Sequence, residues 1–358
     1  MARRKLTKEQ LLLEAVKKVA PGTELREALE HIIDAKTGAL IVIGDTEDVL
    51  KLCDGGFELD CKLTSQKLFE LAKMDGAIIL DSEVKRILRA NVHLVPDSSL
   101  PTSETGMRHR TAERVAKQTK ALVISISQKR DVVSLYVGNM KYVLLDLRVI
   151  LSKANQALQT LERYKTRLDQ VLSNLSALEF EDLVTLSDVS TVLQRAEMVE
   201  RVSREIERYI TELGVEGRLI EMQLDELMAN VEEERLLVIK DYCRDSRRAQ
   251  RIRQELSKLS PVQLLDLMEF CQVLGYEGPV NILDSAVHSR GYRCLRKIPR
   301  LPMSVVNKIV DKFKDLQAVL KASIKDLDDV DGVGEVRAKA IQEGLRKLKE
   351  YHLLERYI

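Results

Sequence analysis

The hydrophobic pattern of the chain changes near residue 147, and this change limits the fold more than any other feature of the sequence. After it, apolar residues recur at alternating steps of three and four, from Leu147 to Leu175 and again from Val189 to Leu213. Such stripes predict long amphipathic helices of the coiled-coil type. Before it, apolar residues form short continuous runs, as in strands buried on both faces of a sheet, at 39–43, 77–80, 122–126 and 132–137.

Residues 1–145 therefore predict an α/β domain with a mixed sheet. Amphipathic patterns between the apolar runs predict helices at 6–19, 23–35, 65–73 and 108–118. The stretches 87–90 and 92–95 predict either a hairpin or two short strands. Residues 146–286 predict an all-α spacer, whose third helix occupies about 219–228 and can continue to 242.

The composition sets limits on the class of protein. A chain of 358 residues is long enough for two or three domains, and 32% charged residues with no Trp favour many amphipathic helices. The five cysteines contain no C-x-x-C pair, so reduced thiols are expected in place of a disulfide framework or a zinc site. The sequence predicts neither a signal peptide nor a membrane span, and a cytoplasmic protein is expected.

The net charge of +1 implies that any cationic surface must be local. The most basic run lies at 244–253. It predicts a solvated helix face, or a phosphate-binding surface if a nucleic-acid module lies nearby.

Residues 287–358 predict such a module, a helix–hairpin–helix DNA-binding domain. Within 327–341, two spaced apolar residues precede a Gly-apolar-Gly hairpin. Gly332 and Gly334 allow the backbone to approach a phosphate, and Val333 packs inward. Arg337 and Lys339 add positive charge, and these five residues are the predicted DNA-binding set. Upstream, 298–313 looks like a partner half whose prolines replace the glycine hairpin, and we expect this half to serve packing.

Two short motifs in the α/β domain carry chemistry. Asp75 and Gly76 stand at a turn from helix to strand, and Arg108, His109 and Arg110 stand at the start of the helix predicted over 108–118. A helix N-terminus offers free N–H groups to phosphate, and arginine can bind phosphate oxygens in bidentate fashion. One carboxylate beside such a cationic helix start predicts a site for a nucleotide and a metal ion. Lys120 stands where a glycine turn is expected.

Together these features resemble the diadenylate cyclase family of DNA integrity scanning proteins. The resemblance covers essentially the whole chain and rests on Asp75-Gly76-Ala77, the segment 106–111, the strand at 38–44, the helical spacer and the C-terminal module. It implies condensation of two ATP molecules into cyclic di-AMP with Mg²⁺ or Mn²⁺, by two subunits that face each other. It further implies a homo-octamer, association with the nucleoid, and regulation of the cyclase by branched DNA.

The resemblance also implies roles for individual residues. Asp75 helps to bind the metal and to activate the 3′-hydroxyl, and His109 meets the metal or a phosphate. Arg108 and Arg110 hold phosphates, so the catalytic set is Asp75, Arg108, His109 and Arg110. The nucleotide-binding set is Gly76, Leu94, Met107, Arg108, His109, Arg110, Thr111 and Ser127.

Two other functions compete with a DNA-regulated cyclase. One is a non-enzymatic protein that binds DNA junctions and senses nucleotide with its N-terminal domain. The other, a helix–hairpin–helix repair glycosylase, is weakly supported, because no base-flipping pocket can be assigned around Gly332. Asp75 and the arginine pair favour the cyclase, since a pure sensor needs no carboxylate at the metal.

Overall fold

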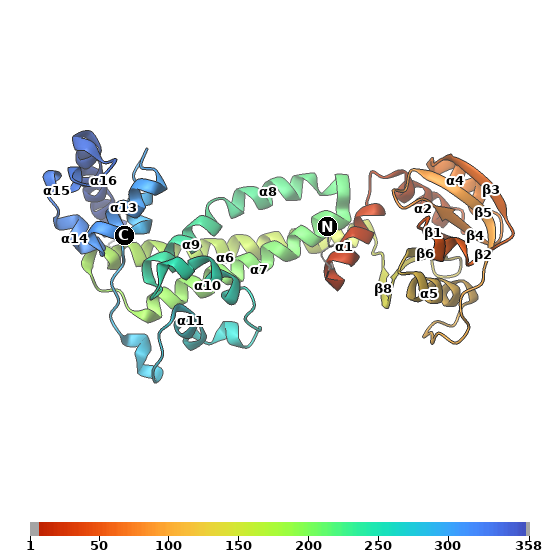
Figure 1. The fold of residues 1–358 in the computed structure, drawn as a ribbon, viewed down its shortest axis with the longest axis horizontal. Coiled ribbons are helices and arrows are strands. Elements are labelled where there is room, and N and C mark those ends of the chain that lie inside the picture. Colours follow the sequence, from red (N-terminus) through yellow and green to blue (C-terminus); the bar gives the residue numbers. More distant parts are fainter. Residues whose placement is uncertain (1–6, 356–358) are drawn as a thin grey trace. The chain divides into compact units, whose positions relative to one another are not determined.

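A computed structural model describes residues 7–355 of the chain (Figure 1). The chain divides into two compact units. The first consists of Met1–Gln156 and Ile206–Met222, and the second of Ala157–Glu205 and Gln223–Ile358. The long helices α6 (Leu147–Glu181) and α7 (Leu186–Leu213) contribute residues to both units.

The first unit contains a mixed sheet with the strand order β2-β5-β4-β1-β6-β7-β8, in which β3 also pairs with β5. Its strands are β1 (Leu40–Ile43), β2 (Cys53–Asp54), β3 (Phe57–Lys62), β4 (Ala77–Leu80), β5 (Arg86–Leu94), β6 (Leu122–Ser127), β7 (Val132–Val137) and β8 (Met140–Val143). Its helices before α6 are α1 (Lys8–Lys18), α2 (Glu24–Asp34), α3 (Glu47–Leu50), α4 (Ser65–Ala72) and α5 (Met107–Thr119). The pairing of β1 with β4 is parallel and that of β1 with β6 is antiparallel, which confirms the predicted mixed sheet.

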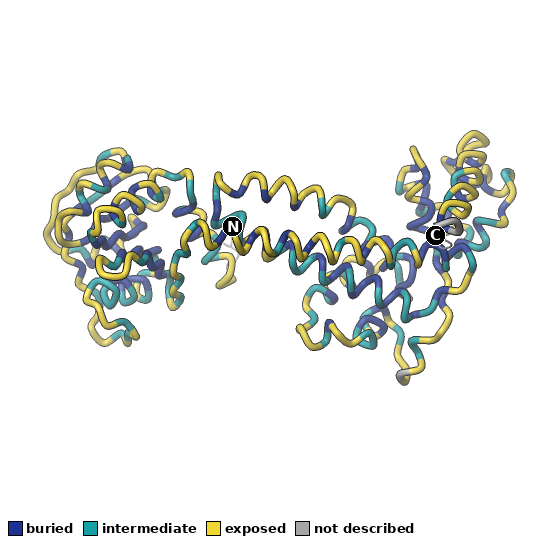
Figure 2. The backbone as a smooth tube through the Cα atoms, turned by 180° about the vertical axis from the view of Figure 1, so that it is seen from behind, coloured by how far each residue is buried: buried dark blue, intermediate teal, exposed yellow. Residues whose placement is uncertain are grey.

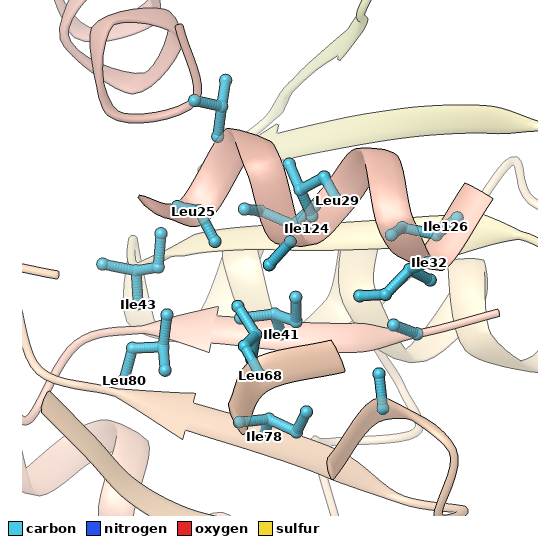
Figure 3. Packing of buried hydrophobic residues seen from close by; sticks show 14 of the residues in the cluster. Leu25, Leu29, Ile32, Ile41, Ile43, Leu68, Ile78, Leu80, Ile124 and Ile126 are labelled. Atoms are coloured by element: carbon cyan, nitrogen blue, oxygen red, sulfur yellow. The ribbon is translucent and has the colours of Figure 1, made fainter. Parts of the chain in front are cut away.

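The central strands are buried on both faces, as their continuous apolar sequences predict. On one face, helices α1, α2 and α4 cover a cluster that includes residues of α2, α4, β1, β4 and β6 (Figure 3). The labelled members are Leu25, Leu29, Ile32, Ile41, Ile43, Leu68, Ile78, Leu80, Ile124 and Ile126. Figure 2 shows buried stretches of backbone, in dark blue, gathered inside the first unit.

The opposite face of the sheet is covered mainly by α5. Its buried residues are Ala112, Val115 and Ala116, and they pack with Val42, Val123 and other apolar residues of the strands. Two of the three are alanines, so the helix axis can come close to the sheet. The helix ends at Lys120, which adopts the left-handed conformation (φ 60°) of a glycine C-cap. This explains why a glycine turn is expected there.

One sequence expectation is wrong around residue 91. The stretches predicted as a hairpin or two short strands form the single strand β5, in which Asn91 has a positive φ of 54°. Asparagine tolerates this conformation, so the strand bulges and continues where a turn is expected. Opposite the bulge, Gly55 and Gly56 separate β2 from β3, and both of these short strands pair with β5.

The second unit is all-α apart from one isolated bridge, as predicted. Beyond its parts of α6, α7 and α8, its α-helices are α9 (Val231–Tyr242), α10 (Ala249–Leu256), α11 (Leu267–Leu274), α12 (Tyr292–Arg296), α13 (Met303–Phe313), α14 (Leu316–Lys321), α15 (Ile324–Asp328) and α16 (Gly334–Glu355). Helix α8 (Arg218–Met228) does not continue to 242, because Asn230 takes a positive φ of 64° and α9 begins after it. The described short 3₁₀ helices are η1 (Gly214–Gly217), η2 (Ser246–Arg248), η3 (Gln263–Leu265) and η4 (Val280–Asp284).

A buried ionic cluster joins α6, α9 and α12 within the second unit. Arg293 of α12 is fully buried, and Nη1 lies 3.4 Å from Oε1 of Glu179 of α6. Asp241 of α9 accepts hydrogen bonds from the backbone N–H groups of Tyr292 and Arg293 at 2.7 and 3.0 Å. Burial and the nearby Glu179 carboxylate raise the pKa of Asp241 to about 7. Since removing one member leaves other charges buried and unpaired, this cluster ties the three helices together.

The two adjacent glycines of the β2–β3 break provide a matched stability test. Both have positive φ, but a Cβ atom would meet nothing within 4 Å at Gly55, whereas at Gly56 it would lie 2.7 Å from the carbonyl oxygen of Ala90. We expect Gly55→Ala to lower the free energy of unfolding by about 1 kcal/mol through conformation alone, and Gly56→Ala by at least about 2 kcal/mol. Urea unfolding of both variants measures the difference. Equal losses of unfolding free energy in the two variants would show that the backbone of β5 can shift at this position without cost.

The buried Asp241 predicts a pH-dependent stability. Its folded pKa lies above the ordinary value of 3.8, so between about pH 4 and pH 7 the folded chain holds a proton that the unfolded chain has lost. This contribution to the free energy of unfolding is present at low pH and decreases as the pH rises through that window. We expect Asp241→Asn to flatten the slope by roughly 1 kcal/mol per pH unit in urea unfolding, relative to the parent protein. The exposed Asp225→Asn is the control, and parallel curves for all three proteins would refute the assignment.

Candidate functional site

One edge of the sheet gathers the segments that carry the predicted site. Strands β1 and β4 are parallel and begin side by side, with Leu40 opposite Ala77. Strand β6 runs the other way, with Ser125 opposite Leu40, so Ser127 at its end reaches the same edge. The residues just before β1 and β4, including Asp75 and Gly76, therefore meet the end of β6 here. Leu94, at the end of β5, also belongs to this edge, since Val92 pairs with Ala77.

The start of α5 lies at this edge. A Cβ atom at position 38 would lie 2.1 Å from Nη1 of Arg108, so the absence of a side chain at Gly38 gives the guanidinium its place. Nη2 of Arg108 lies 3.7 Å from Oδ1 of Asp75, whose side chain is fully exposed. No side chain caps the helix at Gly106, which leaves its first N–H groups open to an anion. The structure thus brings together the two predicted motifs.

Gly76 holds Asp75 in this position. Its φ is 89°, and a Cβ atom would lie 2.8 Å from the carbonyl carbon of Asn91 and 2.9 Å from the carbonyl oxygen of Val92. Only glycine fits this turn against β5 without displacement of the backbone. The turn before β4 therefore packs directly against the backbone of β5 at its bulge.

His109 points towards β7, away from the Arg108–Asp75 pair. Its Nδ1 lies 3.0 Å from the hydroxyl oxygen of Tyr136, which is buried. Burial lowers the pKa of His109, and Lys141, Arg108 and Arg130 lower it further against an opposing effect of Glu104. Burial likewise raises the pKa of Tyr136 well above its ordinary value. At neutral pH the pair consists of a neutral imidazole and a protonated phenol.

The loop between β5 and α5 is tied to the outer face of α5. The Glu113 carboxylate accepts hydrogen bonds from the Thr102 hydroxyl at 2.5 Å and the Ser103 N–H at 3.1 Å. Arg114 donates to the carbonyl oxygens of Leu100 and Ser98. These bonds hold the end of the loop, including Glu104, beside the start of the helix.

The other predicted nucleotide-binding residues lie around this centre. Met107 is 81% exposed, while Leu94 is buried in the sheet face under α5. Arg110, Thr111 and Ser127 are half-buried, and within residues 7–355 the side chain of Arg110 makes no hydrogen bond or ion pair. Arg110 is thus a cation without an internal partner at the start of α5.

Sequence reasoning missed Tyr136 and Glu104 as members of the site and gave Gly38 no role of its own. The sequence does contain a signal for Tyr136. Polar groups occupy alternate positions of two otherwise apolar strands, namely Ser125 and Ser127 in β6 and Ser134 and Tyr136 in β7. The side-chain oxygen of Ser125 is buried without a hydrogen-bond partner in the described part of the chain. Glu104 lies in a loop, where no periodicity marks it.

The side chains at this edge of the sheet are suited to bind a metal ion only together with a substrate that supplies further ligands. Among residues 7–355, no three His, Cys, Asp or Glu side chains gather as a metal-binding group. Asp75 offers one exposed carboxylate. Mg²⁺ is commonly held by one or two carboxylates together with substrate phosphates and water, so Asp75 fits an ion that arrives with a nucleotide.

The second predicted site lies at the hairpin between α15 and α16. Gly332 and Gly334 have φ values of 88° and 63°, and Val333 is buried, as expected. A Cβ atom at Gly334 would meet nothing within 4 Å, so the hairpin backbone is accessible there. The two cations are engaged locally: Arg337 donates to the carbonyl oxygen of Gly332 at 2.5 Å, and Lys339 pairs with Glu335 at 2.7 Å.

The upstream half repeats the packing of this hairpin. Leu295, Ile298 and Leu301 are buried at the same spacing as Leu327, Val330 and Val333. Arg300 has a positive φ of 61° at the position that corresponds to Gly332. The predicted tandem arrangement is therefore visible in the conformation as well as in the sequence.

The basic run at 244–253 is largely compensated. Arg247, Arg251 and Arg253 pair with the carboxylates of Asp245, Glu255 and Glu232, respectively. These pairs favour a solvated helix face over a phosphate-binding surface. A separate observation concerns membranes: none of the helices within residues 7–355 has the length and apolar composition needed to cross a bilayer.

Comparison with known proteins decides the family. Residues 26–141 match the family model described as DisA bacterial checkpoint controller nucleotide-binding, and residues 144–283 match the DisA bacterial checkpoint controller linker region. The DNA integrity scanning protein DisA of Clostridium acetobutylicum is 52% identical over 354 residues, which cover 99% of each chain. The chain belongs to the DisA family.

Other DisA proteins agree over the same length. That of Symbiobacterium thermophilum is 56% identical over 347 residues, covering 96% of this chain and 98% of its own. That of Clostridium tetani is 52% identical over 358 residues, covering 100% and 99%. The predicted resemblance is thus confirmed, and the chain is an enzyme, a nucleotidyltransferase of the diadenylate cyclase type.

Two solved structures are similar to part of this chain. DacA of Staphylococcus aureus, solved as a double cysteine mutant, is 22% identical, with a TM-score of 0.28 over 38% of this chain and 89% of its own. A protein of Bacillus cereus described as a hypothetical membrane spanning protein is 26% identical, with a TM-score of 0.31 over 34% and 61%.

Proposed function

We propose that the enzyme condenses two ATP molecules into cyclic di-AMP and two pyrophosphates, and that DNA bound at the C-terminal hairpin regulates this reaction. The observation that carries the first part is the 3.7 Å approach of Arg108 to Asp75 at the uncapped start of α5. A carboxylate and a guanidinium side by side, next to free N–H groups, suit a triphosphate that carries a divalent ion.

The reaction needs little covalent participation by the protein. Each 3′-hydroxyl oxygen attacks the α-phosphorus of the other ATP, the bond to pyrophosphate breaks, and the hydroxyl proton is lost. Positioning and neutralisation of charge supply most of the catalysis in such transfers. Because the product is twofold symmetric, two copies of this chain would present their sites to each other, as one contact within a homo-oligomer that we take to be an octamer.

The residues at the sheet edge take defined roles in this proposal. Asp75 orients the 3′-hydroxyl and, with the triphosphate, holds Mg²⁺ or Mn²⁺. The ion, when bound, neutralises phosphate charge and polarises the oxygens attached to it. Arg108 and Arg110 bind the phosphates, the free N–H groups of Met107, Arg108 and His109 face them from the helix start, and the Thr111 hydroxyl adds a further hydrogen bond. Gly76, Leu94 and Ser127 surround the nucleotide, with Leu94 beside the adenine and Ser127 at the terminal phosphates.

The hairpin proposal rests on the accessible backbone at Gly334 and on the tandem packing of α12–α13 and α15–α16. Contacts of this kind touch the sugar–phosphate backbone and respond to the shape of branched DNA more than to its sequence. The DNA-binding set is Gly332, Val333, Gly334, Arg337 and Lys339. Substrate and DNA together imply a cytoplasmic enzyme that associates with the nucleoid.

The first test is turnover by the purified protein. With ATP and Mg²⁺ or Mn²⁺, we expect cyclic di-AMP and pyrophosphate, resolved by chromatography and mass. Asp75→Asn keeps the size of the side chain and removes its charge, and we expect it to lower turnover by at least about 10²-fold while DNA binding stays unchanged. Glu70→Gln, on the exposed surface of α4, is the matched control.

Two results would contradict this assignment. Full activity of Asp75→Asn would remove Asp75 from the mechanism. Intact ATP with both metals, together with tight binding to branched DNA, would favour the non-enzymatic scanning function.

The second test separates the hairpin from the cyclase. Gly334→Glu places a negative charge where a DNA phosphate would lie, and we expect it to weaken binding to a four-way junction by at least about tenfold, with unchanged basal cyclisation. Gly334→Ala carries the same conformational cost without the charge. The affinity of the parent protein should fall with salt, with a log–log slope of about −0.9 per duplex phosphate contacted. Equal affinity of the two variants, or no salt dependence, would refute binding at this hairpin.

A further inference from the structure

A groove on the C-terminal module lies between α14 and α16, which are labelled in Figure 1. Gln317, Leu320 and Lys321 line it from α14. The residues that line it from α16 recur at steps of three and four, and so form one face of that helix. They include Lys339, Gln342, Glu343, Arg346 and Lys349. Four of the lining side chains are thus cationic and one is acidic, in a chain whose net charge is only +1.

Two of the four cations have no internal partner. Lys321 and Lys349 are exposed, and within residues 7–355 neither makes a hydrogen bond or an ion pair. The carboxylate of Glu343 does not compensate them, because it pairs with Nζ of Lys347 at 2.9 Å. The groove therefore carries free positive charge on both of its walls.

The other two cations are held only by exposed pairs along α16. Nζ of Lys339 lies 2.7 Å from Oε1 of Glu335, and Nη1 of Arg346 lies 3.7 Å from Oε1 of Glu350. Exposed pairs of this kind add little to the free energy of unfolding. Both cations are therefore free to exchange a carboxylate for an external anion.

The groove and the hairpin are separate surfaces of the same helix. Arg337 and Arg346 are nine residues apart, about two and a half turns, so their side chains leave α16 on opposite sides. Lys349 follows Gly334 by fifteen residues, which places it about 22 Å further along the helix axis. A straight duplex that lies across the hairpin therefore reaches Arg337 without entering the groove.

The spacing of the cations suits a nucleic-acid backbone. Lys339 and Lys349 are ten residues apart, or about 15 Å along α16. Over this length one strand of B-DNA carries about four phosphates. A single small anion would leave most of this charge unused, whereas a sugar–phosphate chain can contact all four cations.

We propose that the groove between α14 and α16 is a second binding site for the DNA backbone, which takes a further arm of a branched DNA while the hairpin takes the first. The inference rests on the proposed function for the identity of the partner. Lys339, predicted as part of the hairpin site, lies on the groove face and marks where the two surfaces meet. A linear duplex then engages the hairpin alone, and a four-way junction engages both surfaces. The preference for branched DNA follows from the placement of charge and not from base sequence.

Binding of two DNAs to the full-length protein tests the groove. The probes are a labelled four-way junction and a linear duplex with the sequence of two of its arms, measured by fluorescence anisotropy at fixed salt. We expect Lys321→Gln/Lys349→Gln to weaken junction binding by about tenfold and duplex binding by less than about twofold. The log–log salt slope for the junction should fall in magnitude by about 2, one for each lysine lost.

A matched control removes the same charge elsewhere. Lys153 and Lys258 are exposed and lie outside residues 287–358. Lys153→Gln/Lys258→Gln should change the affinity for either DNA by less than about twofold. An equal loss of junction affinity in the two double variants would show an effect of net charge alone and would overturn the inference.

Glu343→Gln is expected to act in the opposite direction. It removes the one carboxylate that lines the groove and frees Lys347, so junction binding should become about threefold tighter while duplex binding stays the same. Damage to the fold would not tighten binding. Unchanged junction affinity in this variant and in Lys321→Gln/Lys349→Gln would overturn the inference, and would leave an acidic protein segment as the partner that suits the groove.

Gly334→Glu separates this inference from the proposed function of the hairpin. If both hold, Gly334→Glu weakens binding to both DNAs, whereas the double lysine variant weakens binding to the junction alone. An equal loss on junction and duplex in the double lysine variant would refute a site for a further arm. Normal affinity of Gly334→Glu, with weakened junction binding in the double lysine variant, would support the groove and refute the hairpin as a DNA site.

Discussion

The packing of α5 against the sheet is the contact on which the site depends. Ala112, Val115 and Ala116 bring the helix close to β6 and β7, and this approach brings the start of α5 to the edge where β1 and β4 begin. Helix position, and with it the direction of the free N–H groups, is therefore set by apolar burial about one turn away from the chemistry. A change in the size of these three side chains would move Arg108 and His109 together, because both follow from the same helix axis.

Two glycines, together with α5, determine the geometry of the site. Gly38 leaves room for the Arg108 guanidinium, and Gly76 allows the turn of Asp75 to lie against the bulge of β5. Successive residues of α5 point about 100° apart, so Arg108 reaches the edge of the sheet while His109 reaches Tyr136. Two adjacent residues of α5 therefore lie in different environments. Arg108 lies beside the exposed carboxylate of Asp75, and the neutral imidazole of His109 is half-buried beside Tyr136.

The sequence predicted the elements with strong periodicity and missed those set by tertiary contacts. Patterns in the sequence predicted the buried strands at 39–43 and 77–80, the helix at 108–118 and the long helices α6 and α7. The single strand β5 was not, because the conformation of Asn91 is decided by its partners across the sheet. The same holds for the site. Motifs predicted Asp75 and Arg108, which the structure brings together, whereas Glu104 lies in a loop whose course depends on hydrogen bonds to Glu113 and from Arg114.

The weakness of the Asp75–Arg108 pair is consistent with a site that exchanges ligands. Its atoms are 3.7 Å apart and the carboxylate is fully exposed, and such pairs add little to the free energy of unfolding. The pair therefore does not hold either residue in place. The turn at Gly76 fixes the backbone of Asp75, and the packing of α5 fixes that of Arg108, so both residues stay at the sheet edge when their side chains separate. In the proposed reaction a phosphate would bind the guanidinium and a metal ion would bind the carboxylate without loss of structure, since the backbone that presents them is held by burial and not by their mutual attraction.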